Sequence, residues 1–130
     1  MPPHALDLIL LSDTFAVSKL PTDASLPPWA ATGPFFSLTR TADELSIVCK
    51  ESLVPQGVTC DRGWKCFRVA GSMPFSLVGV LASLVQPLAA AGISVFAVST
   101  FDSDYVLVKT ADLERAQRAL EQTGHSFRQL

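Results

Sequence analysis

The sequence predicts an α+β fold in which two helices cover one face of an antiparallel sheet, and it predicts two such modules in tandem. In the C-terminal half, strand-like and helix-like periodicities alternate in the order β-α-β-β-α-β, the split βαβ pattern of ferredoxin-like folds. Residues 36–48 also resemble residues 96–108 when shifted by 60 positions, which indicates a duplicated module. We therefore expect an irregular, strand-rich module over residues 1–63 and a complete βαββαβ module over residues 64–130, with strands exchanged between the halves.

Length and composition fit a fold of this kind. The chain has 130 residues, of which 48% are hydrophobic and 17% are charged, and its net charge is -2. A chain of this length buries a core without disulfides or metals, and its apolar content excludes intrinsic disorder. Its ten basic residues are scattered, so we expect no nucleic-acid partner.

The first half is dominated by short segments rich in β-branched, aromatic and other apolar residues. The five strands expected there cover residues 6–11, 15–20, 35–39, 45–49 and 64–69. Asp13 separates the first two strands, and the third and fourth form a hairpin. The Pro-rich segment 21–34 predicts a loop with one helical turn at residues 28–31. A second helical turn is expected at residues 51–55, followed by a loop that includes residues 61–63.

The first helix of the second half is indicated by leucines that recur at helical spacing between residues 77 and 88. We expect this helix to run from residue 75 or 76 to residue 91. Pro87 should kink it or mark its last turns, and Gly92 is placed to cap its C-terminus.

The second helix is expected to begin at a cap formed by Thr110 or Asp112 and to run through residue 122, with Gly124 ending it. Three inward-facing positions, Leu113, Ala116 and Leu120, lie on one face of it. The strands of this half are expected at residues 93–99, 105–109 and 126–129. The first of them alternates as a central strand buried on both faces would.

Residues 69–101 contain no Asp, Glu, Lys or Arg. A membrane span needs about 20 apolar residues, but Pro74, Pro87 and Gly92 interrupt this stretch, so we interpret it as a buried helix feeding a strand. The first apolar segment has no basic region before it and contains Asp7, so no secretory signal is expected.

The three cysteines, Cys49, Cys60 and Cys66, do not have the spacing of a zinc knuckle or a redox pair. We interpret them as small hydrophobic residues in a reducing cytoplasm, and we expect no metal and no cofactor. The two histidines lie near the chain ends, and no catalytic constellation or phosphate loop is present. We therefore predict that the chain is not an enzyme.

Two segments could bind a ligand. At residues 69–77 a strand end turns into a helix start, where free backbone N–H groups could hold a carboxylate. At residues 99–105 hydroxyls gather with Asp102 and Asp104, which would suit an ammonium group. Together these segments fit a zwitterion. The alternative is a plain helix cap and a plain hairpin turn.

The same residues resemble the ACT domain. The resemblance is carried by residues 88–108 (LAAAGISVFAVSTFDSDYVLV) and by residues 75–81 (FSLVGVL) before them. Upstream, residues 35–41 (FFSLTRT) and 43–49 (DELSIVC) are similar to the N-terminal half of small bacterial tandem-ACT proteins. That family is related to the arginine-sensing ACT proteins of animals and to the regulatory part of aspartate kinases.

The resemblance implies a regulatory module that binds an amino acid between paired ACT modules. By that resemblance, the backbone of the first segment would hold the main-chain groups of the ligand and the second segment would form the opposite wall. The implied ligand-binding residues are Ser72, Met73, Pro74, Phe75, Ser76 and Leu77 in the first segment and Thr100, Phe101, Asp102 and Asp104 in the second. Ser103 stands where the family pattern has threonine, so the resemblance does not identify the amino acid.

We expect a cytoplasmic homodimer that senses an amino acid and regulates a protein partner, because an unpaired module would leave an apolar edge or face exposed. Two other functions remain open. One is a protein–protein interaction module that dimerises or docks a partner without any ligand. The other is a small enzyme that uses the pair Asp102 and Asp104.

Overall fold

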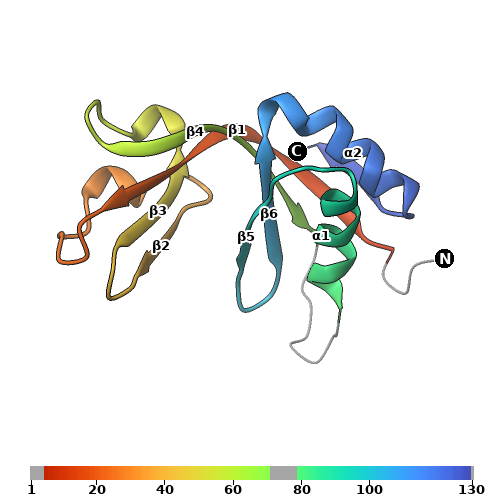
Figure 1. Cartoon of the computed structure of the whole chain (residues 1–130), viewed down its shortest axis with the longest axis horizontal. Helices are drawn as coiled ribbons and strands as arrows, with labels where there is room; N and C mark the ends of the chain where they lie inside the picture. Colours follow the sequence, from red (N-terminus) through yellow and green to blue (C-terminus); the bar gives the residue numbers. More distant parts are fainter. Residues whose placement is uncertain (1–4, 71–78, 130) are drawn as a thin grey trace. The chain divides into compact units, whose positions relative to one another are not determined.

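A computed structural model describes residues 5–70 and 79–129 of the chain (Figure 1). In chain order the elements are β1 (Asp7–Leu20), a 3-10 turn η1 (Pro28–Ala30), β2 (Ser37–Arg40), β3 (Leu45–Lys50), a second 3-10 turn η2 (Glu51–Leu53), β4 (Thr59–Val69), α1 (Val80–Ala90), β5 (Phe96–Ser99), β6 (Asp104–Lys109), a third 3-10 turn η3 (Thr110–Asp112), α2 (Leu113–Gln122) and β7 (Ser126–Gln129). The strand order is β2-β3-β1-β4-β6-β5, and β7 pairs with β1.

The chain divides into two compact units. The N-terminal unit consists of residues 13–64, and the C-terminal unit consists of the residues before Asp13 together with those from Lys65 onward. The long strands β1 and β4 therefore each contribute residues to both units.

The C-terminal unit confirms the predicted α+β, ferredoxin-like order, because β4, α1, β5, β6, α2 and β7 follow one another as β-α-β-β-α-β. Strands β5 and β6 pair antiparallel, from Phe96 opposite Leu107 to Ser99 opposite Asp104. One strand pair of this unit is not antiparallel as predicted: the start of β1 runs parallel to β7.

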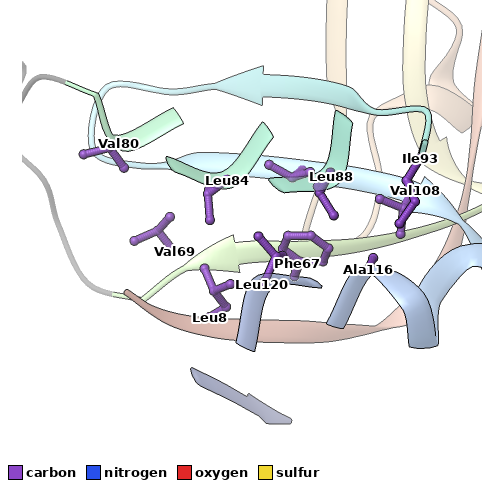
Figure 2. Close-up of a cluster of buried hydrophobic side chains, with 11 residues drawn as sticks. Leu8, Phe67, Val69, Val80, Leu84, Leu88, Ile93, Val108, Ala116 and Leu120 are labelled. Carbon is purple, nitrogen blue, oxygen red and sulfur yellow. The ribbon is translucent and has the colours of Figure 1, made fainter. Parts of the chain in front are cut away.

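Both helices of this unit pack on the same face of its sheet (Figure 2). Val80, Leu84 and Leu88 line the buried side of α1 at intervals of four residues. Of the regularly spaced leucines, Leu84 and Leu88 are buried as predicted, Leu81 is half-buried, and Leu77 lies outside the described residues. Ala116 and Leu120 of α2 are fully buried, which confirms the predicted inward positions. The sheet residues of this cluster are Leu8, Phe67, Val69, Val106 and Val108. Among the described residues no helix is long and apolar enough to cross a membrane.

The N-terminal unit contains the predicted β2–β3 hairpin and both predicted helical turns. Its residues, all of which the structure describes, form no α-helix. Ala30 of η1 instead covers a small core that also contains Ala16, Leu45, Ile47, Cys49 and Val54. On another side Phe15 and Phe35 meet edge to face, with ring centroids 5.5 Å apart.

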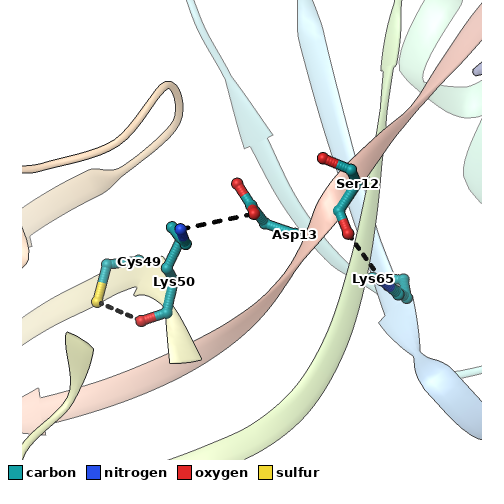
Figure 3. Close-up of polar contacts among 5 residues, drawn as sticks. All are labelled: Ser12, Asp13, Cys49, Lys50 and Lys65. Carbon is teal, nitrogen blue, oxygen red and sulfur yellow. Dashed lines mark hydrogen bonds and ion pairs between the residues drawn. The ribbon is translucent and has the colours of Figure 1, made fainter. Parts of the chain in front are cut away.

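Two predicted strand boundaries in the first half were wrong. Asp13 does not interrupt β1, because the residues after it continue the strand and pair antiparallel with β3. The half-buried Asp13 carboxylate pairs with Lys50 Nζ at 3.7 Å (Figure 3). Next to it, Lys65 Nζ donates to the Ser12 carbonyl at 3.1 Å. Strand β4 begins at Thr59 rather than residue 64, so residues 61–63 belong to a strand and not to a loop.

Hydrogen bonds of Arg62 and Gly63 explain the early start of β4. The Arg62 guanidinium donates to the carbonyls of Glu51 and Val54, and the Gly63 N–H donates to the Glu51 carboxylate at 2.8 Å. Gly63 has a φ of 80°, which a residue with a side chain rarely adopts. The glycine therefore lets the strand turn locally without ending it.

The two helices end as predicted but begin differently. Gly92 and Gly124 follow them with φ values of 74° and 100°, typical of C-terminal caps. Helix α1 begins at Val80, because Gly79 has a φ of 84° and precedes the helix; the earlier part of the predicted helix lies outside the described residues. Asp112 makes no capping hydrogen bond, because its carboxylate instead pairs with Arg115 at 2.9 Å.

The charge-free stretch does not lead into a central strand. Strand β5 begins only at Phe96, stands at the end of the strand order and alternates half-buried with exposed residues. The strand buried on both faces is β6, where Val106, Leu107 and Val108 are fully buried. The sequence pattern missed this because an apolar strand looks the same at an edge and in the middle of a sheet.

The internal repeat is real, but its shift is 59 positions and not 60. With this shift β2 falls on β5, β3 on β6 and η2 on η3, each with the same bounds. The hairpin registers also coincide, because Arg40 pairs with Leu45 as Ser99 pairs with Asp104. The match of Phe36 with Phe96 suggested a shift that was one residue too long.

Candidate functional site

The turn that joins β5 and β6 contains most of the candidate residues that the structure describes. The Thr100 N–H donates to the Ser103 carbonyl at 2.8 Å, which closes a four-residue turn. The Thr100 hydroxyl accepts the Ser103 N–H and donates to the Ser103 carbonyl, both at 3.1 Å. The threonine side chain thus reproduces backbone turn contacts and fixes the shape of the turn.

Ser103 ties this turn to the end of β4. Its hydroxyl donates to the Val69 carbonyl at 2.9 Å. Val69 is the last residue of β4, and residues 71–78 follow it shortly along the chain. The hairpin turn therefore lies beside the point at which the chain leaves β4, although the two segments are 34 residues apart in the sequence.

Asp104 provides the half-buried carboxylate of this turn. Its Oδ1 accepts a hydrogen bond from the Ser99 hydroxyl at 2.5 Å, which orients the carboxylate across the base of the hairpin. Asp102 is exposed, and the Phe101 side chain is 75% exposed. A carboxylate held in place in this way can accept hydrogen bonds from a cationic group.

The structure places Thr100, Phe101 and Asp102 in the turn between β5 and β6, and Asp104 directly after the turn as the first residue of β6. The other predicted site residues, Ser72, Met73, Pro74, Phe75, Ser76 and Leu77, lie outside the described residues. The roles of the Ser99 and Ser103 hydroxyls were not predicted. Their presence on both sides of the acidic turn was the available signal, since Ser and Thr frequently bond to nearby turn backbone.

The corresponding turn of the N-terminal unit has the same framework. The Thr41 N–H donates to the Glu44 carbonyl at 2.8 Å, and the Thr41 hydroxyl accepts the Glu44 N–H at 3.1 Å. Arg40 occupies the position that Ser99 has in the C-terminal unit, and its guanidinium donates to the carbonyls of Thr22 and Ala24. This turn is therefore bonded to the loop that follows β1 by its own arginine.

Two of the three cysteine thiols, those of Cys49 and Cys66, are buried. Burial raises the pKa of the Cys66 thiol. Burial also raises the pKa of the Cys49 thiol, and the nearby Cys60 thiol adds to this while Arg62 opposes it. Burial therefore keeps both thiols neutral and unreactive. Within residues 5–70 and 79–129 no three His, Cys, Asp or Glu side chains gather as they would around a metal ion.

The fold and the turn together define a small α+β module of the ferredoxin type, duplicated within one chain. Comparison with known proteins bears on the family. A model of the ACT domain matches residues 59–122, and a model of a separate N-terminal domain family matches residues 13–57. The ACT match falls on the C-terminal half, where the sequence predicted a complete ACT module.

Three relatives illustrate the range of similar proteins. A protein from Agrobacterium tumefaciens of known crystal structure is 40% identical, with a TM-score of 0.93 over 98% of this chain and 95% of that one. The human protein CASTOR3P is 32% identical in an alignment of 92 positions that covers 61% of this chain and only 56% of the human protein. The regulatory subunit of aspartate kinase from Thermus thermophilus has the same fold, with a TM-score of 0.58, 13% identity and coverage of 85% and 93%.

Proposed function

We propose that this protein is an amino-acid-binding regulatory module without catalytic activity of its own. The observation that carries the proposal is the β5–β6 turn, whose shape is fixed by Thr100 and whose position beside β4 is fixed by Ser103. A binding turn held in this way needs little reordering when a ligand arrives, so less of the binding free energy is lost.

The Asp104 carboxylate is the group proposed to receive the α-ammonium or another cationic group of the amino acid. It is half-buried, and the Ser99 hydroxyl already orients one of its oxygens. A partly desolvated, oriented carboxylate forms stronger charge-assisted hydrogen bonds than an exposed one. Thr100, Phe101 and Asp102 would complete this wall of the site.

The regulatory part of the proposal is supported by the family and by the kind of protein that shares the fold. One such protein is the regulatory subunit of an aspartate kinase. A regulatory role requires that the amino acid binds one arrangement of the protein better than another, because a ligand shifts an equilibrium only by its differential affinity. The three cysteines are free thiols, which suits the cytoplasm as the site of action.

The proposal is tested by a thermal-shift screen with each of the twenty amino acids. An amino acid present at about 100 times its Kd should stabilise the fold by about 2.7 kcal/mol, which raises the Tm by several degrees. Asp104→Ala should abolish that shift. Asp43→Ala removes an acid from the corresponding turn of the N-terminal unit, where it occupies the position of Asp102; it is the control and should retain the shift.

Two outcomes contradict the proposal. One is the absence of any shift with all twenty amino acids in a protein that unfolds cooperatively. The other is a shift that survives Asp104→Ala, which would place the ligand elsewhere.

A homodimer is the second candidate function, favoured by the position of β5. This strand stands at the end of the strand order, exposes Ala97 and Ser99, and leads to the largely exposed Phe101. An edge strand can pair with the same strand of a second copy. Light scattering after size exclusion should give twice the chain mass of 13.9 kDa, and a monomer mass at micromolar concentration would contradict pairing.

A further inference from the structure

Helix α1 contains a proline in its interior, and this removes one of its hydrogen bonds. In an α-helix the carbonyl of each residue accepts the N–H of the residue four positions later. The helical partner of the Ser83 carbonyl would be the N–H of residue 87, but residue 87 is proline and has none. The Ser83 hydroxyl cannot serve instead, because it donates to the Val80 carbonyl at 2.7 Å.

His125 fills the missing position. Its ring nitrogen Nε2 lies 3.1 Å from the Ser83 carbonyl oxygen. The residue is only 4% exposed, although it lies between α2 and β7 near the end of the chain. No residue of α1 carries a charge or a ring nitrogen, so the helix has no donor of this kind on its own side chains.

The other ring nitrogen of His125 determines which form of the ring fits. The Leu6 N–H donates to Nδ1 at 3.1 Å, so Nδ1 must be the acceptor. The proton of the neutral ring must then be on Nε2, where it points at the Ser83 carbonyl. Only the neutral Nε2–H tautomer makes both bonds.

We propose that His125 replaces the absent N–H of Pro87 and thereby fixes helix α1 to the residues that begin β1 and β7. Leu6 directly precedes β1, and its carbonyl accepts the Ser126 N–H at 3.0 Å. The backbone N–H of His125 donates to the Leu120 carbonyl near the end of α2, at 3.1 Å, and this bond holds the residue in place. The position of α1 therefore depends on a side chain supplied by the C-terminal end of the chain.

A double-mutant cycle tests this role in the intact chain. His125→Phe keeps a ring of similar shape but leaves the Ser83 carbonyl and the Leu6 N–H without this partner. It should raise the equilibrium constant of unfolding roughly 10- to 100-fold, because buried polar groups are costly when unsatisfied. In a Pro87→Ala background the helix regains its own N–H donor, so the same change should cost clearly less, by at least about threefold.

The matched control is Ser83→Ala, which alters the side chain but leaves the carbonyl in place. It should show no coupling to His125→Phe. Equal effects of His125→Phe with proline and with alanine at position 87 would overturn the proposal. The tautomer gives an independent test that needs no variant.

Nitrogen-15 NMR of the His125 ring at neutral pH should show a protonated Nε2 and an unprotonated Nδ1. A protonated Nδ1 would overturn the proposal even if His125→Phe failed to fold. Neither the double-mutant cycle nor the NMR measurement involves a ligand. A negative result for the role of His125 is therefore distinguishable from a failure of the proposed amino-acid binding.

Discussion

The N-terminal and C-terminal units are built on the same hairpin but cover it differently. A shift of 59 positions places β2, β3 and η2 on β5, β6 and η3 with the same bounds. In the C-terminal unit two α-helices cover one face of the sheet, whereas in the N-terminal unit the 3-10 turn η1 contributes Ala30 to a smaller core. The hairpin is thus the constant part of the repeat, and the helices are the variable part.

The reason for this difference is visible in the sequence. Helix α1 has apolar residues four positions apart, which gives it a continuous face to bury. The corresponding region of the N-terminal unit, residues 21–34, contains several prolines that prevent a helix from propagating. A short chain segment with prolines can still cover a small core through one 3-10 turn.

The two turns also differ in what they leave available. Arg40 bonds the N-terminal turn to its own loop, through the Thr22 and Ala24 carbonyls. In the C-terminal turn the same position is Ser99, and it orients the Asp104 carboxylate. The predictions below test this contrast, beginning with the largest expected effect.

Helix α1 should contribute more to stability than any single residue of the turns. Leu84→Ala removes a side chain that is 1% exposed and should lower the free energy of unfolding by about 3 kcal/mol, because a cavity remains. Leu81→Ala, at a partly buried position of the same helix, should cost clearly less. Urea denaturation monitored by circular dichroism measures both, and equal losses would contradict the packing described.

The buried thiols of the two units should respond differently to alkaline pH. The Cys66 thiol, whose pKa is raised by burial, stays neutral in the folded chain, whereas an unfolded thiol ionises above about pH 8.5. Protons are then lost on unfolding, so the free energy of unfolding falls as pH rises, by up to about 1.4 kcal/mol per pH unit for one thiol. Cys66→Ala should reduce this slope.

Cys49→Ala is the comparison within the N-terminal unit. It should reduce the alkaline slope less than Cys66→Ala does, because burial raises the pKa of the Cys66 thiol more strongly than that of the Cys49 thiol. Denaturant titrations between pH 7 and pH 10 provide both slopes. A slope unchanged by Cys66→Ala would contradict the neutral, buried thiol.

The equivalent threonines of the two turns should be equal in stability but unequal in binding. Thr41→Val and Thr100→Val each remove a hydroxyl that accepts a turn N–H, and each should cost about 0.5 to 1 kcal/mol. Only Thr100→Val should weaken the binding of an amino acid found in the thermal-shift screen. Isothermal titration of both variants separates the two effects, and equal weakening would remove the functional distinction between the turns.

The smallest expected effect is at Ser18, in β1 of the N-terminal unit. Its side chain is 2% exposed, and its hydroxyl has no hydrogen-bond partner in the structure. Ser18→Ala removes a buried polar group that gains nothing from the fold, so it should be neutral or stabilise by up to about 1 kcal/mol. A clear loss of stability in urea denaturation would contradict this, because it would show that the hydroxyl has a hydrogen-bond partner in the folded chain.

Local periodicity was sufficient to predict the order of elements but not the partners of each strand. The leucine spacing predicted the buried face of α1, and Gly92 and Gly124 marked both helix ends. The continuity of β1 through Asp13 depends on pairing with β3, which is distant in the sequence, and could not be foreseen. The same holds for the edge position of β5, which depends on how strands are ordered.

The candidate site was predictable in composition but not in construction. The acids and hydroxyls of residues 99–104 stood out in the sequence, whereas the bond from Ser103 to the Val69 carbonyl requires the folded sheet. The role of His125 was also hidden. A histidine near the chain end gives no local sign that it bonds to a helix 42 residues earlier.

The central claim is that an amino acid binds at the C-terminal turn and not at its N-terminal counterpart. Backbone amide NMR spectra, recorded while the amino acid that most raises the Tm is added, test it most directly. We predict chemical-shift changes at residues 99–104 and none at residues 40–45. Changes confined to residues 40–45, or no changes in either turn, would contradict it.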